Sequence, residues 1–402
     1  MTRIVLLACA LLCAAAAPSA HAAGVAQTKK VLAAEMARAG ASSGAYVVDL
    51  GTGRALYSED ASVPRMPASV EKLYTTASAL GRYGPQGALA TEVLAATPLD
   101  GTGVLAGDLY LRGGGDPSFD AKAAGLLADL LIERTGITDV QGRVIGDESE
   151  FDGLRGPPSE GYRTSFYVGP LSALTFNRGF TGRRRPLFQA SPPKFAAQAF
   201  RAALRRRGVQ VARAARAGAT PGAALPLAVL NSPGLENLVA SMNVPSDNFI
   251  AETLIKALGA DFGTGGTTSA GAAVVRADAA RLGIRTTVVD GSGLSRSNRT
   301  SPKAVVSLLT AMDESALAEP FALSLPVAGR TGTLHDRMRG NAARDACRAK
   351  TGTLSNVSAL AGYCDTRSGG RVAFAFLMNS VYPWTARRLQ DRMAGALARY
   401  DG

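Results

Sequence analysis

The chain has 402 residues and a formal charge of +12, and this length is enough for a large core or for two domains. The chain has two histidines and four cysteines, of which one histidine and two distant cysteines lie beyond the predicted signal peptide. These three cannot build the usual zinc sites, and we expect no metal or other cofactor. The positive charge could suit nucleic acid, but an export signal argues against that partner and for peripheral association with the anionic cell envelope.

Residues 1–22 are predicted to be a signal peptide. Ile4 to Ala17 is an apolar run, and Ala20-His21-Ala22 is a small-x-small cleavage site. The run is short and rich in alanine for a transmembrane helix, so we expect a product exported to the periplasm without a membrane span. Lipidation at Cys9 is a weaker alternative, because almost no apolar residues precede it.

Removal of this segment limits the chemistry of the mature chain. It would leave His335 as the single histidine and Cys347 and Cys364 as the only cysteines. A serine hydrolase with a histidine base would depend on His335 alone. Lysine is therefore the obvious substitute as general base if a serine is the nucleophile.

The first predicted elements are a helix over 28–39, a β-hairpin over 45–50 and 54–57, and a helix from Ser69 to Leu80. The middle of the chain then changes in character, because short elements alternate with Gly-rich and Pro-rich turns. The elements expected there are strands over 107–111 and 141–145 and helices over 121–134 and 194–207.

The last part of the chain returns to longer elements. These are helices over 233–259 and 267–282, strands over 345–353, 358–364 and 371–381, and a helix over 385–399. The similar texture of the two ends predicts one core domain, formed by residues 23–84 and 224–402. Residues 85–223 are predicted to be an inserted domain or domains.

Ser69-Val70-Glu71-Lys72 is the first of three short motifs that suggest chemistry. Residues three apart share one face of a helix, so the Lys72 amine can reach the Ser69 hydroxyl. The start of a helix also favours a developing anion at Ser69. Lysine can act as a base only where burial or neighbouring cations lower its pKa.

The second motif is Ser246-Asp247-Asn248, which follows Pro245. A second hydroxyl can relay a proton, and an amide can hold both the lysine and a substrate carbonyl. A helix cap would use the same residues, and taken alone that structural interpretation is the stronger one. Ser241-Met242-Asn243 is a near-copy that the residues by themselves do not exclude.

The third motif is Lys350-Thr351-Gly352-Thr353, on a predicted strand. A cation with hydroxyls beside it suits a terminal carboxylate, and Gly352 would let a substrate backbone approach the strand edge. Arg330-Thr331-Gly332-Thr333 is a second copy with arginine. The three motifs in this order form the serine–lysine set of β-lactamases and penicillin-binding proteins.

Longer stretches resemble the low-molecular-mass class C penicillin-binding proteins, the D-Ala-D-Ala carboxypeptidase/endopeptidase family. Together with the three motifs they span most of the mature chain; they are Val48 to Gly53, Pro67 to Leu73, Gly114 to Ser118, Ala251-Glu252, Asp290 to Arg296, Leu325 to Gly329 and Ala349 to Leu354. The resemblance implies an α+β fold. Its core would be like that of the serine β-lactamases and penicillin-binding transpeptidases, an antiparallel sheet with helices on both faces, interrupted by a smaller α/β insertion.

The resemblance also implies a role for each motif. Ser69 would be acylated, Lys72 would activate it, and Ser246 and Asn248 would relay protons and position the substrate. The substrate carboxylate would be held by the third motif, namely by Lys350, Thr351 and Thr353 with Gly352 between them. The backbone N–H groups of Ser69 and Thr353 would form an oxyanion hole.

The implied activity is cleavage of D-Ala-D-Ala bonds in peptidoglycan stem peptides, with β-lactams as covalent inhibitors. A β-lactamase would use the same motifs, but the long separation of Ser69 from Ser246 indicates an insertion. A non-catalytic wall-binding protein is a further alternative, although it would have no need of a serine–lysine pair.

Three details depart from these patterns or refine them. A lysine common before the second motif is Val244 here, and the segment from Asn177 to Pro193 is short for the family. Asp147, in a stretch like that family's, is a candidate for binding the free amino end of diaminopimelate, although a turn-capping role is an equal alternative.

A disulfide between Cys347 and Cys364 is predicted from hairpin register. If Ser355-Asn356 is a two-residue turn, Leu354 faces Val357 and the two cysteines fall opposite each other. They would occupy a non-hydrogen-bonded pair, where side chains lie closest. Export to an oxidising compartment favours the bridge.

Overall fold

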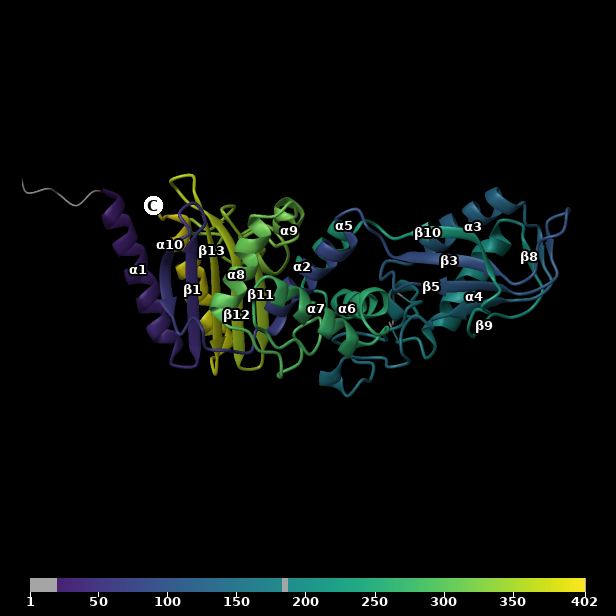
Figure 1. Cartoon of the computed structure of the whole chain (residues 1–402), viewed down its shortest axis with the longest axis horizontal. Coiled ribbons are helices and arrows are strands. Elements are labelled where there is room, and N and C mark those ends of the chain that lie inside the picture. The colour runs from purple at the N-terminus through teal and green to yellow at the C-terminus, as the bar shows by residue number, and fades with distance from the viewer. Residues whose placement is uncertain (1–19, 183–186, 402) are drawn as a thin grey trace, which may run out of the picture.

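The computed structural model describes residues 20–182 and 187–401, and Figure 1 shows an elongated molecule with one sheet near each end. The predicted signal peptide lies outside these residues except for its last three positions, which begin the first helix. Within the described ranges, no helix is both long and apolar enough to cross a membrane.

The core domain is built on a five-stranded antiparallel sheet of order β11-β12-β13-β1-β2. The strands are β1 (Ser43–Asp49), β2 (Ala55–Glu59), β11 (Cys347–Leu354), β12 (Val357–Asp365) and β13 (Arg371–Asn379). The two ends of the chain therefore meet in one sheet. β12 and β13 are buried along nearly their whole length, because helices cover both faces.

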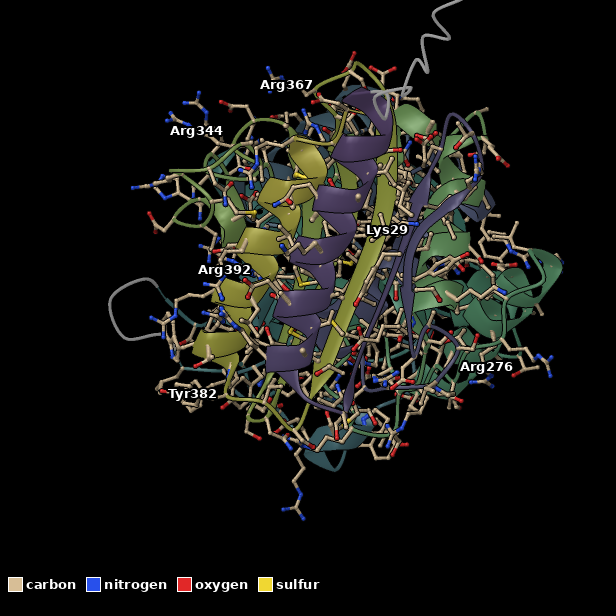
Figure 2. All side chains as sticks on the ribbon, turned by 90° about the vertical axis from the view of Figure 1, so that its left-hand side faces the viewer. Lys29, Arg276, Arg344, Arg367, Tyr382 and Arg392 are labelled. Carbon is tan, nitrogen blue, oxygen red and sulfur yellow. A yellow bond between two sulfur atoms is a disulfide. The ribbon has the colours of Figure 1, made fainter. Side chains whose placement is uncertain are left out.

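One face of this sheet is covered by α1 (Ala20–Ala39) and α10 (Pro383–Ala398), which lie side by side (Figure 2). Arg392 of α10 donates two hydrogen bonds to Glu35 of α1, at 2.6 and 2.8 Å. The apolar side chains between the helices and the sheet include Leu32, Met36, Phe374, Phe376 and Leu397.

The other face carries the helices that lie toward the middle of the molecule (Figure 1). They are α2 (Lys72–Tyr83), α5 (Leu235–Asn243), α6 (Asn248–Phe262), α7 (Thr268–Arg281), α8 (Pro302–Asp313) and α9 (Ala318–Leu323). Their apolar faces form a second core layer with the sheet, which includes Val70, Leu73, Leu254, Leu309 and Leu377. Two short 3-10 turns, η1 (Ala68–Glu71) and η4 (Gly332–Leu334), also belong to this domain.

Several predicted helices differ in their bounds. The helix expected over 28–39 begins at Ala20, and the one expected from Ser69 begins at Lys72, after the 3-10 turn that carries Ser69. The helix expected over 233–259 is two helices, because Pro245 lacks an N–H and Ser246 has a left-handed φ of 65°. The helix expected to end before Gly81 continues to Tyr83, and it ends at Gly84 with a φ of 77°.

The inserted part has a mixed sheet of order β10-β3-β5-β7-β9 and a small parallel sheet of order β4-β6-β8. Its strands are β3 (Ala90–Ala95), β4 (Val104–Leu105), β5 (Leu109–Gly113), β6 (Asp139–Val140), β7 (Val144–Asp147), β8 (Gln210–Val211), β9 (Arg216–Ala217) and β10 (Leu225–Asn231). Its helices are α3 (Ala121–Thr135), α4 (Pro192–Arg206) and the 3-10 turns η2 (Pro158–Glu160) and η3 (Asn177–Gly179).

This part has its own apolar core, which includes Val93, Leu111, Leu127, Phe200 and Ala228. β10 pairs with β3 and buries Ala228 in that core. The boundary expected at residue 223 is therefore too early, since the inserted sheet extends through Asn231.

Candidate active site

Ser69 lies in η1, directly before α2. Ala68 has a φ of 48°, a region that non-glycine residues seldom occupy. Two glycines from distant segments press against this turn. A Cβ on Gly293 would lie 1.9 Å from the Ala68 carbonyl oxygen, and one on Gly352 would lie 3.1 Å from the Ser69 nitrogen. The turn that carries Ser69 is thus held between the 290–295 segment and β11.

Lys72 is fully buried and its amine has three partners. Nζ lies 3.1 Å from Ser69 Oγ, 2.7 Å from Asn248 Oδ1 and 2.6 Å from the Ser292 carbonyl oxygen. Burial lowers the pKa of Lys72 to about 8, against the opposing effect of nearby carboxylates. About a tenth of the amine is therefore neutral at pH 7 and about half at pH 8, far more than for an ordinary lysine.

Three buried acids, Glu71, Glu252 and Asp290, surround Lys72. Glu252 accepts a hydrogen bond from the N–H of Ser292 at 2.8 Å, and so holds the segment whose carbonyl meets the lysine. Burial, reinforced by the charge of Asp290, raises the pKa of Glu252 to about 8 and that of Glu71 well above its usual range. These shifts reduce the negative charge that would otherwise keep Lys72 protonated.

The three residues of the second motif have different contacts. Asp247 caps α6 by accepting from the N–H of Ile250 at 3.0 Å, as the structural interpretation expects. Asn248 bridges Lys72 and the backbone, because its Nδ2 donates to the Tyr167 carbonyl at 3.1 Å. Ser246 also lines the cleft described below.

The near-copy of the second motif is structural. Asn243 is fully buried and donates to the hydroxyl oxygens of Thr76 and Ser324, at 2.8 and 3.0 Å. Val244, which follows this near-copy, offers its carbonyl oxygen to the N–H of Thr333 at 3.1 Å.

The third motif lies on β11, the edge strand of the core sheet. Lys350 is fully buried, and its Nζ donates to the Thr351 carbonyl at 3.0 Å. Burial and the charge of Lys72 lower the pKa of Lys350 well below its usual range. Thr351 and Thr353 line the cleft, whereas Lys350 is not part of its wall. Direct contact of Lys350 with a substrate carboxylate stays a prediction.

Gly352 also makes room for the turn that carries Ser69. A Cβ there would lie 2.5 Å from the carbonyl oxygen of Pro67, so glycine allows β11 to approach the Ser69 turn. The arginine copy of the motif is separate from the buried site. Arg330 is exposed and paired with Asp345, although Thr333 accepts from the Thr351 hydroxyl at 2.8 Å.

These residues surround a cleft of about 1020 Å³ between the core and the inserted part. Ser69, Ser246, Asn248, Thr351 and Thr353 come together on its walls, as predicted. Its other lining residues were not predicted; they include Glu160, Tyr167, Leu294, Arg296, Thr333, Arg337 and Arg387. Leu294 and Arg296 lie in the resembling stretch 290–296, and Thr333 lies in the arginine copy of the third motif. The others come from η2, from loops and from α10, where no local motif signals an active site.

Asp147 does not join this cleft. It lies at the end of β7, where Oδ1 accepts from the N–H of Ser149 at 2.9 Å and Oδ2 from the N–H of Thr220 at 2.8 Å. Burial raises the pKa of Asp147, but these hydrogen bonds outweigh it and lower the pKa below its usual value. The geometry therefore matches the turn-capping alternative.

The predicted hairpin register is confirmed. Leu354 faces Val357, and Cys347 faces Cys364 across β11 and β12. The two cysteines form a disulfide with their Cα atoms 4.1 Å apart. In residues 20–182 and 187–401, no group of three or more His, Cys, Asp or Glu side chains is placed to hold a metal ion.

Comparisons with known structures show the fold. Penicillin-binding protein 4 (dacB) from Haemophilus influenzae matches with a TM-score of 0.77 at 20% identity, covering 90% of this chain and 97% of that one. The same protein complexed with a β-lactam matches with a TM-score of 0.72 at 20% identity, covering 92% and 97%. A predatory peptidoglycan endopeptidase from Bdellovibrio bacteriovorus matches with a TM-score of 0.57 at 20% identity, covering 87% and 90%.

Sequence comparisons show the family. A D-alanyl-D-alanine carboxypeptidase from Actinomadura sp. (strain R39) is 31% identical, and the match covers 90% of this chain and 82% of the relative. The model of the D-Ala-D-Ala carboxypeptidase 3 (S13) family matches residues 25–184 and 187–400. Since both matches extend over most of the chain, this protein belongs to the D-Ala-D-Ala carboxypeptidase 3 (S13) family and is a penicillin-binding serine hydrolase.

Proposed function

We propose that this chain cleaves D-Ala-D-Ala bonds of peptidoglycan stem peptides through an acyl-enzyme on Ser69. The observation that carries the proposal is the contact of Lys72 Nζ with Ser69 Oγ, at 3.1 Å, where Ser69 lines the cleft. Asn248, at the start of α6, accepts a hydrogen bond from the same amine. The name of the family and of the Actinomadura relative supports release of terminal D-Ala as the main reaction.

In the first step, neutral Lys72 accepts the Ser69 proton while Oγ attacks the carbonyl carbon of the penultimate D-Ala. The C–N bond then breaks, and the terminal D-Ala leaves as an amine that receives its proton by way of the Ser246 hydroxyl. Water then attacks the ester carbonyl and gives one proton to Lys72. The ester C–O bond breaks, Lys72 passes that proton to the Ser69 oxygen, and the shortened peptide leaves with the hydroxyl of water as its new carboxylate. Asn248 keeps Lys72 in place and is suited to hold the substrate amide.

The backbone N–H groups of Ser69 and Thr353 are proposed to bind the oxyanion. Thr353 faces Ser358 one position before the pair that flanks the two-residue turn at 355–356. Pairs alternate along an antiparallel ladder, so the Thr353–Ser358 pair is non-hydrogen-bonded. The N–H of Thr353 therefore points away from β12, toward the open edge of the sheet beside Ser69.

Intact-mass analysis after exposure to benzylpenicillin, followed by peptide mapping, tests the assignment. One covalent adduct on Ser69 is expected, and Ser69→Ala should abolish it and the peptidase activity while the protein stays folded. An adduct on Ser246 would refute the assignment. Steady-state assays separate the alternatives: rapid nitrocefin turnover without peptidase activity would indicate a β-lactamase, and no adduct at all a non-catalytic wall-binding protein.

We also propose that the protein is exported to the periplasm and associates peripherally with the envelope. The apolar run before Ala20-His21-Ala22 and the charge of +12 support this. Cell fractionation should find the mature chain in the periplasm, with any membrane-bound part released by salt. A chain that starts at Met1 and remains in the cytoplasm would refute the export.

A further inference from the structure

The cationic side chains on the wall of the cleft are all arginines, within the described part of the chain. They are Arg296, Arg337 and Arg387. Neither motif lysine is free to meet a substrate carboxylate, because Lys72 is engaged with Ser69, Asn248 and Ser292, and Lys350 is fully buried. A substrate that ends in a carboxylate would meet an arginine first.

Two of these arginines are committed elsewhere. Arg337 donates to Asp391 at 2.6 and 2.9 Å and to Gln390 Oε1 at 3.1 Å, so its charge is balanced within the protein. Arg296 donates to Asn356 Oδ1 at 2.8 Å and to the Ser355 hydroxyl, and so braces the turn between β11 and β12.

Arg387 differs from both. Its Nη2 donates to the hydroxyl of Thr353 at 3.2 Å, which places the guanidinium beside the third motif. Its guanidinium carbon lies 4.8 Å from the centre of the Trp384 ring, on the preceding turn of α10. Among residues 20–182 and 187–401, no carboxylate forms an ion pair with Arg387, and the side chain is half-buried.

We propose that Arg387 binds the C-terminal carboxylate of the substrate, together with the hydroxyls of Thr351 and Thr353. This inference rests on the proposed function. It names the residue that makes the enzyme specific for substrates whose terminal D-Ala carries a free carboxylate. The planar guanidinium can offer two parallel N–H donors to a carboxylate. Stacking on Trp384 limits its rotation, so the donors stay directed toward Thr353. In this arrangement Lys350 does not contact the carboxylate itself. Its hydrogen bond to the Thr351 carbonyl helps to hold the strand that carries Thr351 and Thr353.

The test compares benzylpenicillin, which carries a carboxylate, with its neutral methyl ester as acylating agents of Ser69. In wild-type enzyme the free acid should acylate faster. Arg387→Ala should slow acylation by the free acid roughly 10- to 100-fold, the range for a lost hydrogen bond to a charged group. The rate with the ester should stay within about twofold of wild type. With the free acid, the acylation rate of Arg387→Lys should lie between those of wild type and Arg387→Ala. Lysine keeps the positive charge but lacks the two parallel N–H donors of a guanidinium.

Arg388→Ala is the matched control, since Arg388 is the next residue of α10, is exposed and is not part of the cleft wall. It should retain wild-type rates with both compounds. Equal losses on acid and ester in Arg387→Ala, or the same loss in Arg388→Ala, would overturn the assignment. Failure of wild-type enzyme to form any Ser69 adduct would instead refute the proposed function, so the two outcomes are distinguishable.

Discussion

Lys72 is the residue whose environment decides the pH dependence of the reaction. Burial lowers its pKa to about 8, while the charges of Glu252 and Asp290 oppose that effect. Only the neutral amine can accept the Ser69 proton. Below its pKa the neutral fraction changes tenfold with each pH unit, and above the pKa it is nearly constant.

The rate constant for acylation by benzylpenicillin should therefore rise roughly tenfold per unit from pH 6 and level off above about pH 8. Rapid-quench mass spectrometry across pH 6 to 9 measures it. Lys72→Arg serves as the control, because a guanidinium does not release its proton, and it should be inactive throughout. A profile that stays flat over this range would mean that Lys72 is not the base.

Asp147 is a second residue whose role follows from its contacts. Both carboxylate oxygens accept backbone N–H groups within the inserted part, away from the cleft. Asp147→Asn places an NH₂ group against one of those donors and should lower the free energy of unfolding by about 1–3 kcal/mol. Chemical denaturation measures this change.

The same variant tests the alternative role in substrate binding. Its kcat/KM should fall equally, or not at all, for a diaminopimelate peptide and for diacetyl-lysyl-D-Ala-D-Ala. A loss confined to the diaminopimelate peptide would restore Asp147 as a substrate-binding residue.

At the scale of elements, the site depends on how closely β11 approaches η1. Gly352 is the contact point, since a Cβ there would meet the Pro67 carbonyl oxygen at 2.5 Å and the Ser69 nitrogen at 3.1 Å. Gly352→Ala should displace the strand from the Ser69 turn. Because small misplacements of reacting groups are costly, acylation by benzylpenicillin should slow roughly tenfold or more.

The control for this prediction is Gly340→Ala, because a Cβ at Gly340 meets nothing within 4 Å. Circular dichroism should show both variants folded. If Gly352→Ala is acylated at the wild-type rate, the contact between β11 and the Ser69 turn tolerates a Cβ, and this glycine has no part in placing Ser69.

The disulfide stabilises the same strand pair from within the core layer of α1 and α10. The cysteines are 17 residues apart, so the closed loop is short. Replacing both cysteines by alanine should lower the free energy of unfolding by roughly 3 kcal/mol or less. Ellman titration of the denatured, unreduced mature protein should find no free thiol. Two free thiols in protein from the oxidising compartment would contradict the bridge.

At the scale of the whole molecule, the two main sheets lie at opposite ends (Figure 1), and only the 158–167 segment of the inserted part lines the cleft beside the core. The side-chain links between the two parts beside the second motif and along α6 include Asn248 with Tyr167, Arg178 with Asp247, and Lys256 with Asp152. Lys256 is nearly unexposed, with 1% of its side chain accessible, so this ion pair is shielded from solvent on the α6 side. The inserted part thereby supplies one wall, with Tyr167 and Glu160, to a catalytic centre held by the core.

The sequence by itself determined what depends on local geometry. The spacing of Ser69 and Lys72 implied their contact, because three residues span about one helical turn. The two-residue turn at 355–356 set the register of β11 and β12. Residues pair one to one outward from such a turn, so Cys347 falls opposite Cys364. The predicted boundary at 223 missed β10, because its partner β3 lies far away along the chain and no local signal marks the pairing.

The family resemblance selected the second and third motifs over their near-copies, but only the tertiary structure decided how each residue is buried and which partners it meets. It directed Asn248 to Lys72 but Asn243 into the core, and it buried Lys350 while bringing Arg387 from α10 to Thr353. It also showed that Gly352 makes room for the Ser69 turn and that Asp147 is held by its own backbone neighbours. These outcomes depend on packing between segments far apart along the chain, and spacing within a motif carries no information about burial or about partners at such separations.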